Sequence, residues 1–226
     1  MRLFKRVLSL VITAAMAAGL ASCSASPSSV TSDTSQTGAT EKLLESTGHE
    51  TSGSSAKESI SRFGKAVVVY FSCTGNTKDV ANKIASAANC KTYEIVPSKP
   101  YSTEDLNYKN RKSRASKEQN DDSSRPEISV DIAGWESYDT VFIGYPIWFG
   151  KAPKILYTFV ESHDFQGKKV IPFCTSGSSG IGSSATDLAS LAKDSGKWIN
   201  GTRFSATVKA KDITEWLNAL VEAGEI

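Results

Sequence analysis

One short loop of the sequence combines hydroxyl groups, an amide and a glycine in a pattern that suits phosphate binding. Residues 72–77 contain no charged side chain, and they lie between an apolar run and the start of a predicted helix. Backbone N–H groups, hydroxyl donors and the positive end of that helix can together hold a phosphate. The alternative is a strand-to-helix turn in which Ser and Thr only cap the helix. The loop consists of Ser72, Cys73, Thr74, Gly75, Asn76 and Thr77.

Other phosphate-binding motifs do not fit the sequence. It contains no Gly-x-Gly-x-x-Gly and no Gly-Lys-Ser/Thr, which disfavours a Rossmann dinucleotide fold and a P-loop NTPase. A thiol at the amino end of a helix can have a lowered pKa, which raises a cysteine phosphatase built on Cys73 as a rival. That chemistry resembles Cys-x5-Arg, but the residue six positions after Cys73 is Asp79, whose charge would repel a phosphate.

The elements that must position the loop alternate between strand and helix patterns. Runs of apolar residues predict five strands, at residues 66–71, 92–96, 140–145, 169–174 and 198–204. Helical spacing predicts helices at residues 76–88, after Pro153, through Leu188 and Leu191, and from Ile213 to Val221. This alternation predicts an α/β fold with a doubly wound, five-stranded parallel sheet. Ligands of such sheets bind outside the carboxyl ends of the strands.

The loops also carry a resemblance to a known family. Residues 68–77, continuing through Ala81 and Ile84, resemble the FMN phosphate-binding signature of flavodoxins in spacing and residue type. Residues 144–150 and 174–182, after the third and fourth strands, look like loops of a flavodoxin-like family common among bacterial flavoproteins. The resemblance implies FMN as the cofactor and the strand order 2-1-3-4-5, which we take from the family.

The second and third loops make chemical sense for a flavin. Trp148 can offer a flat apolar face to the ring, and such aromatic pairs contribute about 0.5–1.5 kcal/mol beyond area burial; the alternative is a core tryptophan. The third loop can bring backbone N–H and C=O groups to the pyrimidine edge. It lacks the second aromatic of short-chain flavodoxins, so we expect one flavin face to be open to a substrate or a nicotinamide. The candidate residues are Pro146, Ile147, Trp148, Phe149, Gly150, Thr175, Ser176, Gly177, Ser178 and Gly180.

The segment from Pro100 to Trp135 is longer than a plain second helix requires. It contains Tyr101, Tyr108 and many charged side chains, and we expect a helix and loops beside the flavin site. The charges predict a solvated face. The alternative is a lid or a partner-docking role for either tyrosine.

Histidine and cysteine usage does not favour a metal site or a disulfide. His49 and His163 are the only histidines, and no Cys-x-x-Cys occurs. We expect Cys73, Cys90 and Cys174 to be free thiols.

The amino terminus indicates export. A basic start precedes fourteen uncharged, mostly apolar residues, which is shorter than the roughly 20 residues of a transmembrane helix. Residues 20–23, Leu-Ala-Ser-Cys, look like a bacterial lipobox, which implies cleavage of the signal peptide 1–22 and lipidation of Cys23. Several acyl chains on one residue would anchor the chain stably. The alternative is an ordinary secretory signal cut nearby.

Residues 24–62 predict a tether between this anchor and the folded domain. Ser and Thr make up 18 of these 39 residues, so the segment cannot bury enough apolar surface to fold. A flexible chain of this length reaches roughly 35 Å. We therefore expect a signal peptide at 1–22, a lipidated cysteine and disordered tether at 23–62, and a flavodoxin-like domain at 63–226.

These features predict a lipid-anchored FMN protein that carries electrons outside the cytoplasm, at the cell surface or in the periplasm. One alternative is an FMN-dependent NAD(P)H or quinone reductase, and another is a non-redox surface lipoprotein that has lost the cofactor. Expected partners are a redox protein or a small electron donor or acceptor, together with the membrane. Without the signal peptide, 23 basic residues face 24 acidic ones, so nothing favours nucleic acid. No catalytic side chain is expected, because the flavin does the chemistry.

Overall fold

The computed structural model describes residues 62–193 and 195–226, which belong to one compact unit. The predicted signal peptide at 1–22, the lipidated Cys23 and all but the last residue of the predicted tether at 23–62 lie outside the described residues. These parts of the domain assignment stay predictions. His49 itself also lies outside the described residues.

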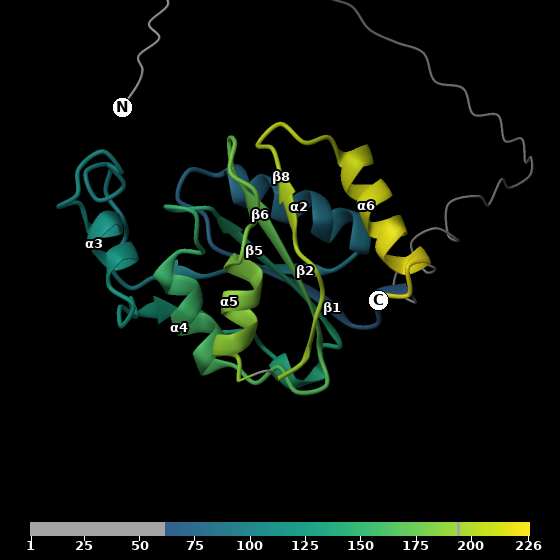
Figure 1. The fold of residues 1–226 in the computed structure, drawn as a ribbon. Coiled ribbons are helices and arrows are strands. Elements are labelled where there is room, and N and C mark those ends of the chain that lie inside the picture. Colours follow the sequence, from purple (N-terminus) through teal and green to yellow (C-terminus); the bar gives the residue numbers. More distant parts are fainter. Residues whose placement is uncertain (1–61, 194) are drawn as a thin grey trace, which may run out of the picture. The chain divides into compact units, whose positions relative to one another are not determined.

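A six-stranded parallel sheet forms the centre of the described domain (Figure 1). Its strands are β1 (Ala66–Tyr70), β2 (Lys91–Glu94), β5 (Thr140–Pro146), β6 (Lys169–Thr175), β7 (Lys197–Trp198) and β8 (Thr202–Phe204). β1 lies between β2 and β5, β6 follows β5, and both β7 and β8 pair with β6. With β7 and β8 taken together as the fifth strand, the predicted α/β class and the order 2-1-3-4-5 are confirmed.

The predicted fifth strand at residues 198–204 is interrupted and forms two short pieces. Pairing of β7 with β6 ends at Trp198, and pairing of β8 with β6 begins at Thr202. Pro172 of β6 lies opposite the break and has no N–H to donate to a neighbouring strand. Gly201 runs close against it, because a Cβ at this position would lie 3.0 Å from the Pro172 carbonyl oxygen. The missing donor explains why the ladder does not continue.

Helices cover both faces of the sheet (Figure 1). The helices of one face are α2 (Asn76–Ala88) and α6 (Ala210–Glu222), and those of the other face are α4 (Lys154–Ser162) and α5 (Ser184–Leu191). Val67 and Val69 of β1 contact one hydrophobic core, whereas Val68 and Tyr70 contact the other. Burial on both faces explains the continuous apolar run in this strand.

The segment between β2 and β5 contains the expected helix together with a strand pair that the sequence does not predict. The helix is α3 (Arg114–Asn120), which lies at one end of the domain beyond α4 in Figure 1. The pair is antiparallel and joins β3 (Val96–Pro97) to β4 (Ile128–Ser129). A 3-10 turn, η1 (Trp135–Ser137), then leads back to β5.

Gly144 leaves the space that the ring of Phe173 fills in the adjacent strand. A Cβ at residue 144 would lie 2.2 Å from Cζ of Phe173, and that ring is fully buried. Gly144→Ala should therefore lower the free energy of unfolding by about 1–3 kcal/mol. Urea unfolding of the FMN-free protein measures this loss. Gly177→Ala is the matched control, because a Cβ added at residue 177 would have no atom within 4 Å. Equal stability of the two variants would contradict this packing.

Candidate functional site

A cavity of about 470 Å³ opens where β1 and β5 end. This volume falls within the range of about 300–1,000 Å³ that is common for small-molecule sites. Its lining comes from the predicted first and second loops and from the segment that contains α3. The lining residues are Ser72, Cys73, Thr74, Thr77, Leu106, Tyr108, Ala115, Pro146, Ile147, Trp148 and Phe149.

The first loop places an uncapped helix end at this cavity. Gly75 is the N-cap residue of α2 with a φ of 86°, a conformation that favours glycine, and no side chain caps the helix. The first N–H groups of a helix have no partner within it, so those of α2 are available to a ligand. Ser72 Oγ accepts a hydrogen bond from the N–H of Gly75 at 3.1 Å, which shapes the loop. The alternative of a simple capping turn therefore does not describe this loop.

The charges nearest the loop are paired. Asp79 lies in the first turn of α2, where its carboxylate accepts a hydrogen bond from Lys83 Nζ at 2.5 Å. Lys78 forms an ion pair with Glu94 at 3.0 Å. Both acids thus have a cation beside them, and the loop itself contributes no charge. An anion at the helix terminus would meet N–H and hydroxyl groups.

Thr175 is the residue at which the three predicted loops meet. Its Oγ1 lies 2.8 Å from Oγ1 of Thr77 in a hydrogen bond between two buried side chains. Its carbonyl oxygen accepts a hydrogen bond from the N–H of Ile147 at 3.1 Å. The end of β6 therefore holds the first and second loops together.

The rest of the third loop lies beside this junction and does not line the cavity. Arg203 of β8 donates to the carbonyl oxygen of Ser176 at 2.6 Å and to that of Gly177 at 2.8 Å. These are carbonyl groups of the kind that the sequence assigned to the polar edge of the flavin ring. Contact of Ser178 and Gly180 with the cofactor, like that of the whole loop, stays a prediction.

The second loop is a tight turn in a strained conformation. The backbone N–H and C=O groups of Trp148 and Lys151 exchange two hydrogen bonds of 3.0 Å. Between them Phe149 has a φ of 51° and Gly150 a φ of 79°. Two successive positive φ values define a type I′ turn, which strongly favours Asn, Asp or Gly at its first central position. Phe149 is therefore a costly residue here, which is common at functional sites.

Aromatic side chains support Trp148 from the side. Its ring lies 5.5 Å from that of Phe71 and 5.3 Å from that of Tyr101, both edge to face. The Tyr101 hydroxyl donates to Glu118 at 2.5 Å, and the Arg114 guanidinium lies 4.0 Å from the Tyr101 ring centroid. Burial and the Glu118 carboxylate raise the pKa of Tyr101 well above its ordinary value, so the hydroxyl stays a donor. Tyr101 thus supports Trp148 and does not line the cavity.

Gln119 of α3 fastens the second loop to the rest of the domain. Its side-chain amide donates to the carbonyl oxygens of Trp148 at 3.1 Å and Ala152 at 3.2 Å. Its Oε1 accepts from the backbone N–H of Lys154 at 3.0 Å. The side chain is buried, so the Ala152 carbonyl and the Lys154 N–H would be left without a partner if the amide were lost, whereas the Trp148 carbonyl keeps its bond from the Lys151 N–H.

The described thiols are free, as expected, at Cys73, Cys90 and Cys174. The rival phosphatase chemistry would require a lowered pKa at Cys73, but desolvation raises the pKa of this thiol to about 11. Such a group is protonated at neutral pH and is a poor nucleophile. Among the described residues, no cluster of His, Cys, Asp and Glu side chains could hold a metal ion.

The structure brings together eight of the predicted cofactor-binding residues and adds Leu106, Tyr108 and Ala115, of which the sequence singled out Tyr108 alone. Gly75, Asn76 and Gly150 shape the loops without lining the cavity. Tyr108, which the sequence named as a candidate lid or docking residue, lines the cavity. It is an aromatic side chain, of the kind that the third loop lacks. Leu106 and Ala115 carry no local signal, because ordinary aliphatic residues in a loop or short helix do not indicate a site. Gln119 could have been found only through its neighbours in space.

Replacing Gln119 with Met should test its role as a positioning residue. The change keeps the side-chain volume but leaves two buried backbone groups, the Ala152 carbonyl and the Lys154 N–H, without partners, which costs about 1–3 kcal/mol for each unsatisfied group. We expect a loss of stability in urea unfolding and a shift in the fluorescence of Trp148. Asn120→Met, on the exposed neighbour, is the control. A Gln119 variant as stable as the control would show that α3 does not hold the loop.

Comparison with known proteins agrees with this geometry. The flavodoxin family profile matches residues 65–220. The structure of a candidate flavoprotein from Bacteroides eggerthii is 43% identical, with a TM-score of 0.64, and the match covers 69% of this chain and 96% of that one. A candidate flavoprotein from Bacteroides uniformis is 39% identical, with a TM-score of 0.65, and the match covers 69% and 98% of the two chains.

A more distant structure shares the fold. It is a flavoprotein from Lactobacillus acidophilus in complex with FMN, 24% identical, with a TM-score of 0.51 and a match over 62% of this chain and 92% of that one. No curated protein matches the chain. The family match confirms both the predicted fold and the predicted cofactor, FMN, which flavodoxins bind where the strand order reverses. The chain belongs to the flavodoxin family.

Proposed function

We propose that this chain binds FMN in the cavity at the ends of β1 and β5 and uses it to carry electrons outside the cytoplasm. The observation that carries the proposal is the uncapped start of α2 beside an uncharged loop, in a cavity that Trp148 also lines. When bound, FMN supplies one- and two-electron transfer. The residues of the chain would bind, orient and shield the FMN.

The first loop would hold the phosphate. The N–H groups at the start of α2 and the hydroxyls of Ser72, Thr74 and Thr77 are donors at the cavity. Hydrogen bonds to a charged group are about twice as strong as bonds between neutral groups. The helix dipole adds attraction for an anion. These donors suit a phosphate monoester without any Lys or Arg in the loop.

The second loop would hold the ring. Trp148 is partly buried, and the edges of Phe71 and Tyr101 fix its orientation. Gln119 holds the carbonyl group of the same residue. Because the Trp148 side chain is already ordered, little free energy is lost in ordering it when a planar apolar ring binds against it.

The openness of the site gives weight to a second candidate, an FMN-dependent NAD(P)H or quinone reductase. Tyr108 and Phe149 line the cavity and are 70% and 52% exposed, so a second molecule can reach its mouth. Anaerobic addition of NADH or NADPH separates the two candidates, since only a reductase of nicotinamides loses its flavin absorbance. A non-redox lipoprotein without cofactor is disfavoured by the intact first loop and by the cavity.

The proposed location rests on the sequence of the amino terminus. Residues 1–22 would direct export, Cys23 would carry the lipid, and the Ser- and Thr-rich residues that follow would separate the domain from the membrane. Over the residues that the structure describes, no helix has the length and apolar character needed to cross a bilayer.

Thr74→Val should separate binding of the phosphate from binding of the ring. The change keeps the shape of an exposed side chain at the cavity but removes its hydroxyl donor. FMN affinity should fall about 10–100-fold, as expected for a lost hydrogen bond to a charged group, while riboflavin affinity should not change. Titration of the FMN-free protein by flavin fluorescence measures both. Thr214→Val on α6 is the control, and equal losses for FMN and riboflavin would contradict the assignment.

Cys23→Ser should release the protein from the membrane. Without the thiol no diacylglyceryl group can be attached, so the acyl mass should be absent from the intact protein. Mass spectrometry and membrane fractionation measure the two effects, with Cys90→Ser as the control. A wild-type chain that carries no acyl mass would contradict the anchor.

A further inference from the structure

The mouth of the cavity is unusual in the side chains that it exposes. Among the described residues, the large hydrophobic side chains that are exposed are Val96, Tyr108 and Phe149, and the last two line this cavity. Phe149 lies in a strained turn, as its positive φ shows, and its side chain is exposed. Exposed apolar groups that gather at one place mark a contact site more often than a random surface.

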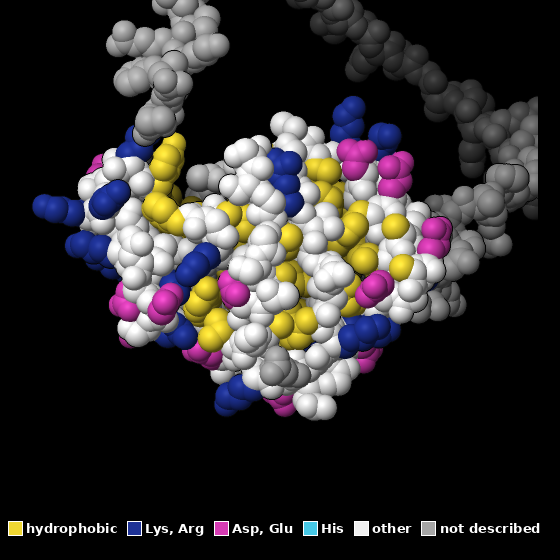
Figure 2. All heavy atoms as spheres, viewed as in Figure 1, with side chains coloured by type: hydrophobic (Ala, Val, Ile, Leu, Met, Phe, Trp, Pro, Cys, Tyr) yellow, Lys and Arg dark blue, Asp and Glu magenta, His cyan; other side chains and the backbone are white. Residues whose placement is uncertain are grey.

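The same region carries the positive charge of the domain. Residues 62–226 hold 21 Lys and Arg against 19 Asp and Glu, whereas residues 99–120 alone hold six against three. The remainder of the domain is therefore slightly negative. Figure 2 shows dark blue side chains gathered at the end of the domain where α3 lies in Figure 1. The excess is local and lies beside the cavity, since this segment also contributes part of its lining.

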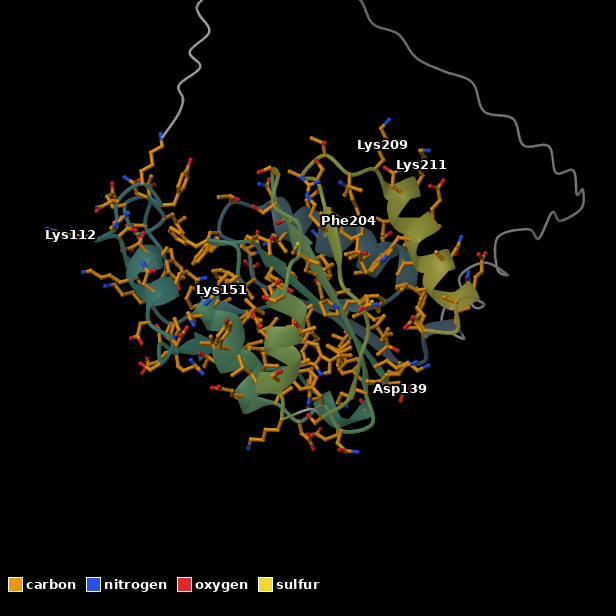
Figure 3. The ribbon with its side chains drawn as sticks, viewed as in Figure 1. Lys112, Asp139, Lys151, Phe204, Lys209 and Lys211 are labelled. Atoms are coloured by element: carbon orange, nitrogen blue, oxygen red, sulfur yellow. The ribbon has the colours of Figure 1, made fainter. Side chains whose placement is uncertain are left out.

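Most of these cations are free to meet a partner. Arg114 forms an ion pair with Glu118, but five exposed basic residues of the segment form no ion pair among the described residues. We call these five side chains, together with Tyr108 and Phe149, the basic rim. The five are Lys99, Lys109, Arg111, Lys112 and Lys117. Figure 3 shows Lys112 extending outward from the domain, on the side opposite Lys209 and Lys211.

This arrangement suits a large partner better than a small one. Charges that extend outward cannot converge on a single small anion, but they complement a broad acidic surface. Complementary charge speeds association and orients the partners before contact. The exposed aromatic rings then give the apolar centre that such a contact needs.

We propose that the basic rim docks the acidic face of an electron-transfer protein and brings its redox centre to the mouth of the cavity. The proposal rests on the proposed function, because the exchange requires FMN in the cavity. In each encounter one electron passes between FMN and the redox centre of the partner, so that one side is oxidised by one electron and the other is reduced by one.

Two forms of one probe protein, one acidic and one basic, test whether the positive charge of the basic rim directs docking. The full chain is loaded with FMN, reduced with dithionite, freed of excess reductant and mixed in stopped flow with ferric cytochrome c, whose haem iron accepts one electron. Native cytochrome c is basic, and the succinylated form is acidic with the same haem. For the acidic form the second-order rate constant should fall about tenfold or more between roughly 20 mM and 200 mM salt, because screening removes the attraction. For the native form it should not fall.

Charge variants locate the effect on the molecule. Lys109→Gln, Arg111→Gln and Lys112→Gln together should lower the rate constant with the acidic form about tenfold at low salt and flatten its salt dependence. Lys91→Gln, Lys209→Gln and Lys211→Gln remove the same charge elsewhere and should leave the rate within about twofold. Rates that respond equally to the two triple variants would overturn the proposal.

A binding measurement separates this proposal from the proposed function. Zinc-substituted succinylated cytochrome c exchanges no electrons in the dark, and its binding to the FMN-free chain can be followed by calorimetry at low salt. Binding that the rim variant loses and the control variant keeps supports the docking face even if FMN is absent. A chain that binds FMN but prefers native cytochrome c, or whose rim binds only anionic phosphatidylglycerol vesicles, would overturn the docking proposal and leave the FMN assignment intact.

Discussion

The hydrogen bonds of Thr175 hold together the loops on which the site depends. Its hydroxyl reaches Thr77 at the start of α2, and its carbonyl oxygen accepts from Ile147 in the second loop. Both loops follow strands of one parallel sheet, so their positions are already set to within a few ångströms by the ladder of β1, β5 and β6. The hydroxyl pair is buried, and a buried polar group without a partner is costly, so the contact is strongly favoured. The cavity is thus a property of three strand ends fixed to one another.

The outer wall of the cavity has a different origin. It comes from the segment between β2 and β5, which contains α3 and the short pair of β3 and β4. Gln119 and the ring of Tyr101 attach this segment to the second loop. The inner wall therefore belongs to the sheet and the outer wall to an addition, and the exposed aromatic and basic side chains lie on or next to the addition. In our proposals the inner wall binds the cofactor, and the outer wall selects what approaches it.

The sequence predicts the sheet well because burial on both faces leaves a direct trace in residue type. β1 is apolar throughout, and the first loop keeps its donors and its glycine together within six residues. The site residues found in this way form three groups, and each group is a short run of sequence at the end of its own strand. Gln119 and Arg203 escaped because they act on backbone groups 26 or more residues away, and nothing near them in the chain indicates this. The interruption of the fifth strand depends in the same way on Pro172 in its neighbour, and the raised pKa of Cys73 depends on desolvation in the folded domain.

The interruption opposite Pro172 also shapes the outer border of the sheet. Where a long, straight strand would stand, two pieces of two and three residues leave few consecutive backbone groups in line. A long unpaired strand invites the same strand of a second copy to add to the sheet, which is the first step of aggregation. The opposite border, β2, begins with Lys91 and ends with Glu94, and charged side chains on a border strand discourage such addition as well. Both borders thus disfavour self-association through the sheet, which leaves the mouth of the cavity as the surface suited to contact with another molecule.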